Sequence, residues 1–248
     1  MNIKSVVKYQ ILDNRTAILV FYIVVVCVIA LFSVSVSDAD FARIGGFEMA
    51  AVIFLFIVGL NSFRETFRMM IQSGVSRRSM FKGFLITAAI LSIGMSLVNA
   101  GILWAMKALE PNGNLEFTGL FEEMYTQRYT ESSGPVQIAL EGLLFLICIT
   151  AVAIMLGYFI TIMYYRLNKS GKIAISVGVP AVLIIGLPIF DAVVMNGGIY
   201  RTFWRLVAFA FGFLNGYNPY YAIVSSLLVF ALLAALSWML VRRTVVKD

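Results

Sequence analysis

The sequence predicts an all-α polytopic membrane protein, and three observations lead to this prediction. Hydrophobic residues make up 61% of the 248 residues and charged residues only 13%, whereas roughly 25% charged residues is usual in a soluble domain. The mean hydropathy is +0.92. The apolar residues also form long runs, which is typical of membrane-spanning helices. This composition excludes a soluble enzyme, a nucleic-acid-binding domain and a disordered chain.

Six apolar runs are long enough to cross a bilayer as helices. In chain order they cover about 16–36, 47–63, 81–106, 136–165, 173–194 and 221–241. A shorter apolar piece, Phe203–Leu214, begins beside two arginines, and we interpret it as a re-entrant or interfacial helix before the sixth span. The apolar core of the first run exceeds the 7–15 residues of a cleaved signal peptide, which favours an uncleaved first span.

The distribution of basic residues predicts that both termini lie in the cytoplasm. In this orientation the cytoplasmic segments hold 14 of the 19 Lys and Arg residues, and few of the acidic ones. Residues 1–15 have apolar side chains at helical spacing, with Lys4 and Lys8 near the opposite face. This segment predicts a cytoplasmic amphipathic helix along the inner membrane surface, or else a basic flank that only orients the first span.

The predicted cytoplasmic loop at residues 64–78, together with Phe63 just before it, contains a second amphipathic pattern. Its apolar side chains follow i, i+4, i+7, i+8 spacing and therefore share one helical face: Phe63, Phe67, Met70 and Ile71. The polar side chains lie off that face: Arg64, Glu65, Arg68 and Gln72. The pattern predicts a short helix that lies across the loop.

A sharp turn is predicted after this short helix. Gly74 can end it in a left-handed conformation, and Ser76 can cap the next helix. Arg77 then falls in a first helical turn, where the helix dipole disfavours positive charge. That placement favours contact with anionic headgroups or with an acidic partner. A membrane-hugging loop whose basic residues only set the topology is the alternative.

The stretch from Asn61 to Gly83, with its Gly74-Val-Ser-Arg77 turn and basic flank, resembles the loop between spans two and three of ABC-2-type transporter permeases. The six-span layout, the large outer loop and the short apolar piece are also similar to that family. In the family this loop carries the coupling helix that docks into the ATPase subunit. The resemblance therefore implies an ATPase-docking set: Arg64, Phe67, Arg68, Met70, Ile71, Gly74, Ser76 and Arg77.

The sequence contains no GxxxxGK[ST] phosphate loop and no histidine, so we expect no enzymatic activity, cofactor or metal in this chain. ATP and Mg²⁺ are expected on a separate ABC ATPase subunit. Six spans are half of the usual set in the family, which implies a second permease chain, either a homodimer or a paired homologue. The resemblance further implies a single permease domain over residues 1–248, located in a bacterial plasma membrane.

The extracellular loop at residues 107–135 has aromatic side chains at every fourth position: Phe117, Phe121, Tyr125 and Tyr129. This spacing predicts an amphipathic helix, which is either a lid over the substrate path or packing against the span ends. Asn99 is a polar residue well inside the third span. Because polar residues inside spans are costly and often functional, Asn99 is a further candidate on the substrate path.

The predicted function is that of a membrane-spanning permease subunit of an ATP-driven ABC exporter. The predicted spans offer almost no fixed charge to bind an ion or a sugar. We therefore expect an amphiphilic substrate, such as a peptide antibiotic, a toxin peptide or a lipid-like molecule. A secondary transporter or channel, and a non-transporting membrane anchor or sensor partner, are the alternatives.

Overall fold

The computed structural model describes residues 3–35, 42–108, 115–129 and 134–244. Five of the described helices are long and apolar enough to cross a membrane, or six when α2 and α3 count as one broken span with a bend of 41°. The prediction of a helical multi-pass membrane protein is confirmed at this level. Parts of the predicted N-terminal helix and of the outer loop lie outside the described residues.

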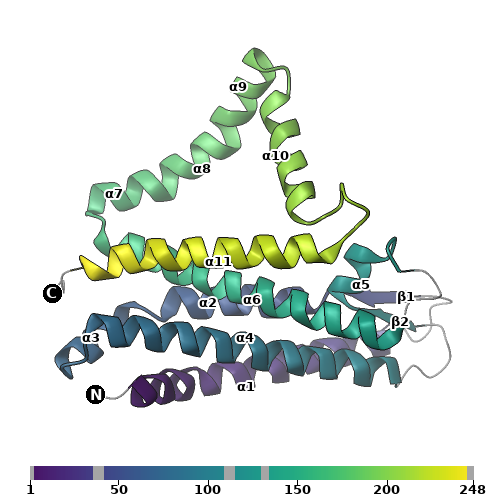
Figure 1. The fold of residues 1–248 in the computed structure, drawn as a ribbon, viewed down its shortest axis with the longest axis horizontal. Helices are drawn as coiled ribbons and strands as arrows, with labels where there is room; N and C mark the ends of the chain where they lie inside the picture. Colours follow the sequence, from purple (N-terminus) through teal and green to yellow (C-terminus); the bar gives the residue numbers. More distant parts are fainter. Residues whose placement is uncertain (1–2, 36–41, 109–114, 130–133, 245–248) are drawn as a thin grey trace.

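Five helices run side by side and form the bundle (Figure 1): α1 Ile3–Ser35, α2 Glu48–Asn61, α4 Arg77–Ala108, α6 Pro135–Arg166 and α11 Pro219–Arg242. Within it, α6 packs against α2 and α11, and α1 packs against α4. Helix α1 begins and helix α11 ends at the same end of the bundle, where α3 Arg64–Gln72 also lies. We call this end, where α4 begins and α6 and α11 end, the basic end.

The opposite end of the bundle carries two short strands, and we call it the sheet end. β1 Ala42–Gly45 pairs in parallel with β2 Leu115–Thr118, and the short helix α5 Leu120–Tyr125 follows after Gly119. The described residues are mostly helical, as the sequence predicts, and this short sheet is a local addition that was not predicted. Four-residue strands between long helices are too short to produce a recognisable alternating pattern.

The prediction that the aromatic residues of the outer loop form one amphipathic helix is wrong. Phe117 lies in β2, whereas Phe121 and Tyr125 lie in α5 and Tyr129 follows it in a coil. Gly119, which is extended, separates the strand from the helix. The four aromatic residues therefore lie in a strand, a helix and a coil, and they do not share one helical face.

The N-terminal segment is not a separate interfacial helix, because α1 continues without a break over 33 residues. Its first turns pack on the basic end of α4. A Cβ atom at Gly83 would lie 2.6 Å from the side chain of Val6, which is fully buried. The Thr87 hydroxyl donates a hydrogen bond of 2.9 Å to the Gln10 side chain. The face predicted to lie on the membrane surface is therefore the face that contacts α4.

Two glycines allow α2 and α6 to approach each other closely. A Cβ atom at Gly157 would lie 2.2 Å from the Phe56 carbonyl oxygen, and one at Gly59 would lie 2.1 Å from the Ile154 carbonyl oxygen. The Thr161 hydroxyl donates a hydrogen bond of 2.6 Å across the same contact, to the carbonyl of Leu60. Small residues at helix contacts are typical of membrane bundles, in which van der Waals packing drives association.

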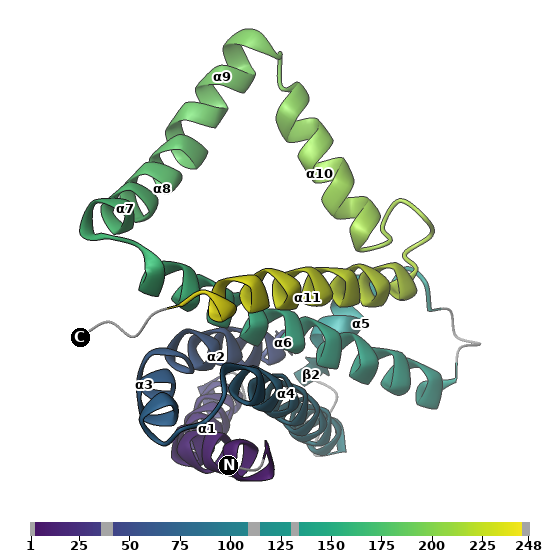
Figure 2. The ribbon, with the colours of Figure 1, turned by 60° about the vertical axis from the view of Figure 1, so that its left-hand side comes forward.

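The remaining helices form a hairpin, residues 169–210, that stands away from the bundle (Figures 1 and 2). Its first arm is one bent helix that includes two π-helical turns: α7 Lys169–Ile173, η1 Ala174–Gly178, α8 Val179–Ala181, η2 Val182–Gly186 and α9 Leu187–Val194. The second arm, α10 Gly198–Ala210, leads back toward the sheet end, where α11 begins.

Pro180 and Pro188 bend the first arm of the hairpin without ending it. Each follows a π-helical turn. The wider turn leaves room for the proline ring, which would otherwise clash with a carbonyl of the preceding turn, and it tolerates the hydrogen bond that proline cannot donate. At the apex of the hairpin, both carboxylate oxygens of Asp191 accept hydrogen bonds from the first N–H groups of α10. These donors are Ile199, at 2.8 Å, and Tyr200, at 3.1 Å. Asp191 therefore caps α10 and joins the two arms.

Candidate functional sites

The turn between α3 and α4 has the geometry that the sequence predicts. Gly74 has a φ of +73°. The Gly74 N–H donates to the Ile71 carbonyl at 3.0 Å, and the Val75 N–H donates to the Met70 carbonyl at 2.9 Å, which is the hydrogen-bond pattern of a Schellman helix end. Ser76 then caps α4, because its hydroxyl accepts the N–H of Ser79 at 3.2 Å. The predictions for Gly74 and Ser76 are confirmed.

The apolar face of α3 is buried inside the chain itself. Phe67 and Met70 have 0% and 1% of their surface exposed. The Phe67 ring stacks on Phe63 at 4.9 Å and meets Tyr165 of α6 edge-on at 5.8 Å. Phe67 and Met70 therefore hold α3 on the bundle, and the prediction that they fill a groove on a partner is wrong.

The polar face of α3 is the surface that remains accessible. Arg64, Glu65, Gln72 and Gly74 are exposed, whereas Arg68 and Ile71 are partly buried. Arg77 lies at the start of α4 and donates a hydrogen bond of 2.9 Å to the carbonyl of Arg242. Because Arg242 is the last residue of α11, Arg77 connects the turn to the end of that helix. The turn therefore presents a charged surface on a well-packed base.

A cavity of about 430 Å³ lies at the sheet end, between α4, α5 and α6. Most of its lining is apolar: Ala100, Leu103, Trp104, Gly119, Leu120, Phe121, Ile138, Ala139, Gly142, Leu143, Phe145 and Leu146. Three charged residues also line it. Lys107 and Glu122 form an ion pair at 2.6 Å, and the buried Glu48 accepts a hydrogen bond of 3.1 Å from the Leu120 N–H. This combination of an apolar wall and a few charges fits an amphiphilic molecule.

Only one of the predicted aromatic residues of the outer loop, Phe121, lines this cavity. Its ring lies on the backbone of Gly142 in α6. Phe117 and Tyr125 are buried, and the Tyr125 hydroxyl donates a hydrogen bond of 2.8 Å to the Phe211 carbonyl. Burial raises the pKa of Tyr125 to about 12. Tyr125 therefore fastens α5 to the segment between α10 and α11, and does not form a lid.

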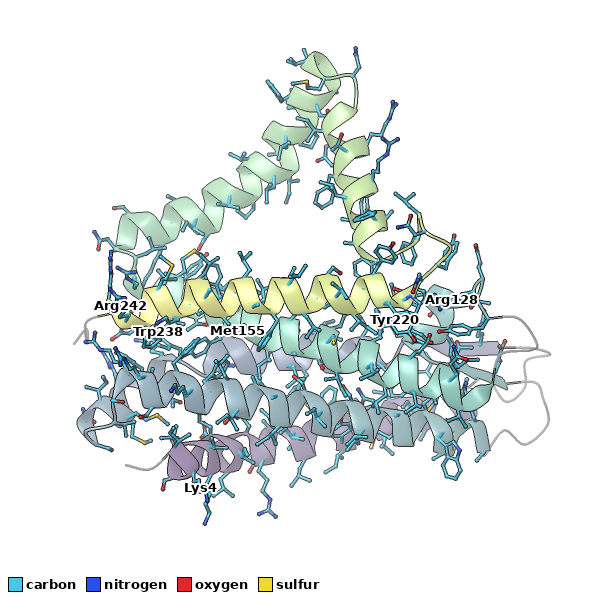
Figure 3. The ribbon with its side chains drawn as sticks, in the orientation of Figure 1. Lys4, Arg128, Met155, Tyr220, Trp238 and Arg242 are labelled. Atoms are coloured by element: carbon cyan, nitrogen blue, oxygen red, sulfur yellow. The ribbon has the colours of Figure 1, made fainter. Side chains whose placement is uncertain are left out.

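Tyr129 belongs to a polar cluster around the buried Glu141, at the start of α6. The Tyr129 hydroxyl donates to the Glu141 carboxylate, which also accepts the Gln137 side chain and the Tyr220 hydroxyl, each at 3.0 Å. Arg128 lies over the Tyr220 ring, 5.7 Å from its centroid (Figure 3). Burial is the larger cause of the raised pKa of Tyr129, and the hydrogen bond to Glu141 raises this pKa further. The cluster joins the outer loop, α6 and α11.

This cluster was not predicted from the sequence. The available signal was the spacing of Gln137 and Glu141, which at i, i+4 share one helical face. The other partners, Tyr129 and Tyr220, are close only in the folded chain. Their contribution could not be read from local spacing.

Asn99 lies inside the bundle and not in the cavity. Its side-chain oxygen accepts a hydrogen bond of 3.2 Å from the Tyr22 hydroxyl of α1, which also lies 3.1 Å from the Met95 carbonyl. The Asn99 amide nitrogen is buried and has no hydrogen-bond partner in the part of the chain that the structure describes. The structure therefore separates Asn99 from the other candidates for the substrate path and places it at the α1–α4 contact.

Comparisons of the chain with models of known protein families, with curated proteins and with solved structures find no match. The functional argument therefore rests on the residues and on their geometry. Two sites at opposite ends of the bundle stand out, the α3–α4 turn at the basic end and the cavity at the sheet end. Helix α4 begins at the first and lines the second.

Proposed function

We propose that the chain is the membrane-spanning permease subunit of an ATP-driven exporter, and that a separate ATPase subunit docks on the α3–α4 turn. The observation that carries the proposal is the course of α4. This helix starts at the turn with Arg77 and extends over 32 residues to the sheet end. Its last turns contribute Ala100, Leu103, Trp104 and Lys107 to the cavity.

The packing of α3 supports a mechanical role for the turn. Because Phe67 and Met70 are buried, a force on the exposed face of α3 acts on the bundle and does not merely displace a loose loop. The Schellman end and the Ser76 cap connect α3 to α4 without a flexible linker. A shift of α3 by a docked ATPase would therefore tilt or slide α4 and change the shape of the cavity, which lies about 35–45 Å along α4 at 1.5 Å per helical residue.

The revised docking surface is polar. It consists of the exposed side chains of Arg64, Glu65 and Gln72 together with the partly buried Arg68. Charged residues at the rim of an interface tune partner choice and association more than affinity. We place the basic end in the cytoplasm because basic residues prefer that side of the membrane. A second permease chain, identical or homologous, would complete the usual number of spans.

The cavity supports an amphiphilic substrate, such as a membrane-active peptide or a lipid-like molecule. Its apolar wall suits a hydrophobic segment, and the Lys107–Glu122 pair together with Glu48 provides charges near one end. The three carboxylates that could otherwise suggest a proton relay already have structural roles. Glu48 accepts from Leu120, Glu141 holds the tyrosine cluster and Asp191 caps α10. These roles favour an ATP-driven transporter over a proton-driven one.

The docking surface is tested by reversing its charge. In the Arg64→Glu/Arg68→Glu variant, we expect co-purification of the ATPase subunit to fall at least tenfold, because two cations become anions at the interface. The ATPase is the co-expressed chain with a phosphate loop, which we expect to be encoded beside this gene. The readout is the ratio of ATPase to permease after affinity purification from membranes.

Two controls make this test specific. Arg201→Glu changes an exposed arginine of the hairpin and should leave the ratio unchanged. Phe67→Asp, which places a charge in the core, should prevent folding of the permease and is therefore not a docking variant. Normal ATPase recovery with the folded double variant would contradict docking at this turn.

A further inference from the structure

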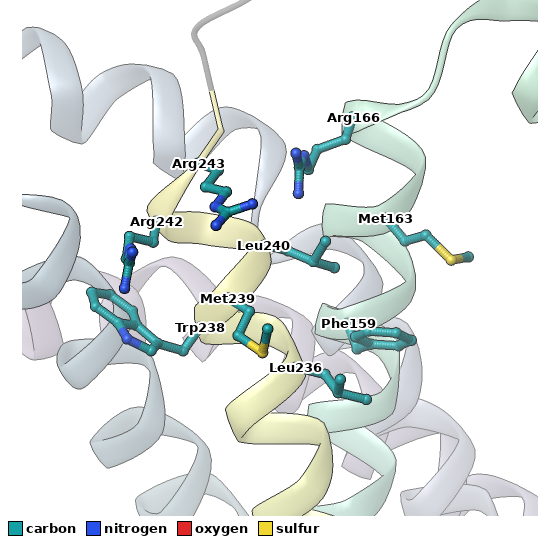
Figure 4. Close-up of a pocket in the computed structure, with 9 residues that line it drawn as sticks. All are labelled: Phe159, Met163, Arg166, Leu236, Trp238, Met239, Leu240, Arg242 and Arg243. Carbon is teal, nitrogen blue, oxygen red and sulfur yellow. The ribbon is translucent and has the colours of Figure 1, made fainter.

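A groove of about 400 Å³ lies at the basic end, between the last turns of α6 and α11 (Figure 4). Apolar side chains from both helices form its floor, among them Phe159 and Met163 of α6 and Leu236 of α11. Three arginines also line it: Arg166, Arg242 and Arg243. Figure 4 shows that Arg166 and Arg243 extend toward one another at the end of the groove where α6 and α11 both end.

The groove is positively charged as a whole, because its lining contains three arginines and no acidic residue. The described acidic residues of the basic end are Asp13 and Glu65, which belong to α1 and α3, and neither helix lines the groove. Arginine presents a planar fork of N–H groups that matches a phosphate. The arginines mark the ends of two membrane-spanning helices and therefore lie at the depth of lipid headgroups.

We propose that this groove binds one anionic phospholipid from the leaflet at the basic end. The phosphate lies between Arg166 and Arg243, Arg242 lies to one side near Trp238, and an acyl chain lies along the apolar floor. The charge selects the lipid class, because the positive headgroup of a zwitterionic lipid such as phosphatidylcholine gains nothing from three cations. This binding site is independent of the proposed transport function and does not require an ATPase.

Trp238 provides a reporter at the site. It lines the groove, and its ring is held against Phe81 of α4 at a centroid distance of 5.5 Å. The chain contains three tryptophans, so the Trp104→Phe/Trp204→Phe variant fluoresces from Trp238 alone. We would reconstitute it in vesicles that contain brominated phosphatidylglycerol or brominated phosphatidylcholine, because bromine quenches tryptophan at short range. Brominated phosphatidylglycerol should quench Trp238 at a several-fold lower mole fraction than brominated phosphatidylcholine.

Substitution of the arginines tests whether the groove is responsible. Each basic residue near an anionic lipid is worth about fivefold in affinity. In this single-tryptophan background, Arg166→Gln/Arg242→Gln/Arg243→Gln should therefore abolish the preference for phosphatidylglycerol, and the corresponding triple Lys variant should retain most of it. The matched control is Arg64→Gln/Arg78→Gln/Lys82→Gln, which removes three exposed positive charges of the same end from outside the groove. It should keep the preference.

Three results would overturn the proposal. One is equal quenching of Trp238 by the two lipids, and another is a loss of preference in the matched control as large as in the groove variant. The third is release of the brominated lipid by millimolar inorganic phosphate, which would indicate a simple phosphate site without a role for the apolar floor.

Discussion

The bundle and the hairpin have similar composition but are held together in different ways. Within the most apolar windows of α4 and α6, 39% and 44% of the residues are buried, whereas none is buried in the corresponding window of 169–194, the first arm of the hairpin. All three segments pass the same test of length and apolarity. Hydrophobicity therefore identifies a span but does not indicate whether it packs against other helices.

The difference lies in the backbone contacts that each region makes. In the bundle, Gly59 and Gly157 bring two helices into direct contact. In the hairpin, Gly178 has no heavy atom within 4 Å of the position of a Cβ atom. The hairpin keeps its shape through local features, namely the two π-helical turns and the Asp191 cap. Its apolar side chains, such as Val177, Leu183 and Ile184, are left exposed by the rest of the described chain.

The largest expected effect comes from adding one methyl group at the α2–α6 contact. Gly157→Ala places a Cβ atom 2.2 Å from the Phe56 carbonyl oxygen, so the two helices must separate. We expect a loss of about 3 kcal/mol of stability, or roughly 10 °C in Tm. The measurement is thermal unfolding of the detergent-solubilised protein, followed by circular dichroism.

The same substitution in the hairpin is the matched control. Gly178→Ala meets no neighbouring atom and improves helix propensity by up to about 1 kcal/mol. Its Tm should therefore stay unchanged or rise slightly. Equal destabilisation by the two substitutions would contradict the contrast between a packed bundle and an open hairpin.

A smaller effect is expected at the apex of the hairpin. Asp191→Ala removes the acceptor for the N–H groups of Ile199 and Tyr200, which should cost about 1–2 kcal/mol locally. Hydrogen exchange of the amides at the start of α10 should accelerate by about tenfold, while the Tm of the bundle changes little. Asp191→Asn retains a side-chain oxygen and should cost less. If Asp191→Ala lowers the Tm as much as Gly157→Ala, the hairpin is not an independent unit.

Local signals in the sequence predicted much of the fold correctly. The apolar runs identified the long helices, and the spacing around Gly74 and Ser76 predicted the α3–α4 turn at the correct residues. Such features depend on composition and on neighbours within four residues. The strand at 115–118 was missed for the same reason, since its partner at 42–45 lies far away in the sequence.

The candidate sites show where local reasoning ends. Periodicity correctly grouped Phe67 and Met70 on one face, but it could not indicate that this face meets Tyr165 of the same chain and not a partner. Helical spacing likewise grouped Phe117 with Tyr129, although Phe117 lies in a strand and Tyr129 lies in a coil beyond α5. In both cases the apolar pattern identified contact surfaces, and only the tertiary structure identified what they contact.

The smallest predicted effect concerns the hydrogen bond that joins α5 to the segment directly after α10. Tyr125→Phe removes the hydroxyl that donates to the Phe211 carbonyl, just after α10. The loss of this hydrogen bond should cost about 1 kcal/mol. Thermal unfolding at pH 8 would detect it as a decrease in Tm of roughly 2–4 °C.

Alkaline pH distinguishes this contribution from simple packing. The pKa of Tyr125 is raised to about 12 in the folded chain, whereas an unfolded tyrosine ionises near 10. The folded state therefore keeps the proton that the unfolded state loses, so the contribution of Tyr125 is fully present below pH 10 and declines as the pH rises toward 12. The stability difference between the native chain and Tyr125→Phe should shrink over this interval, because the variant has no hydroxyl to ionise. A difference that stays constant from pH 8 to pH 11.5 would show that Tyr125 acts by packing alone.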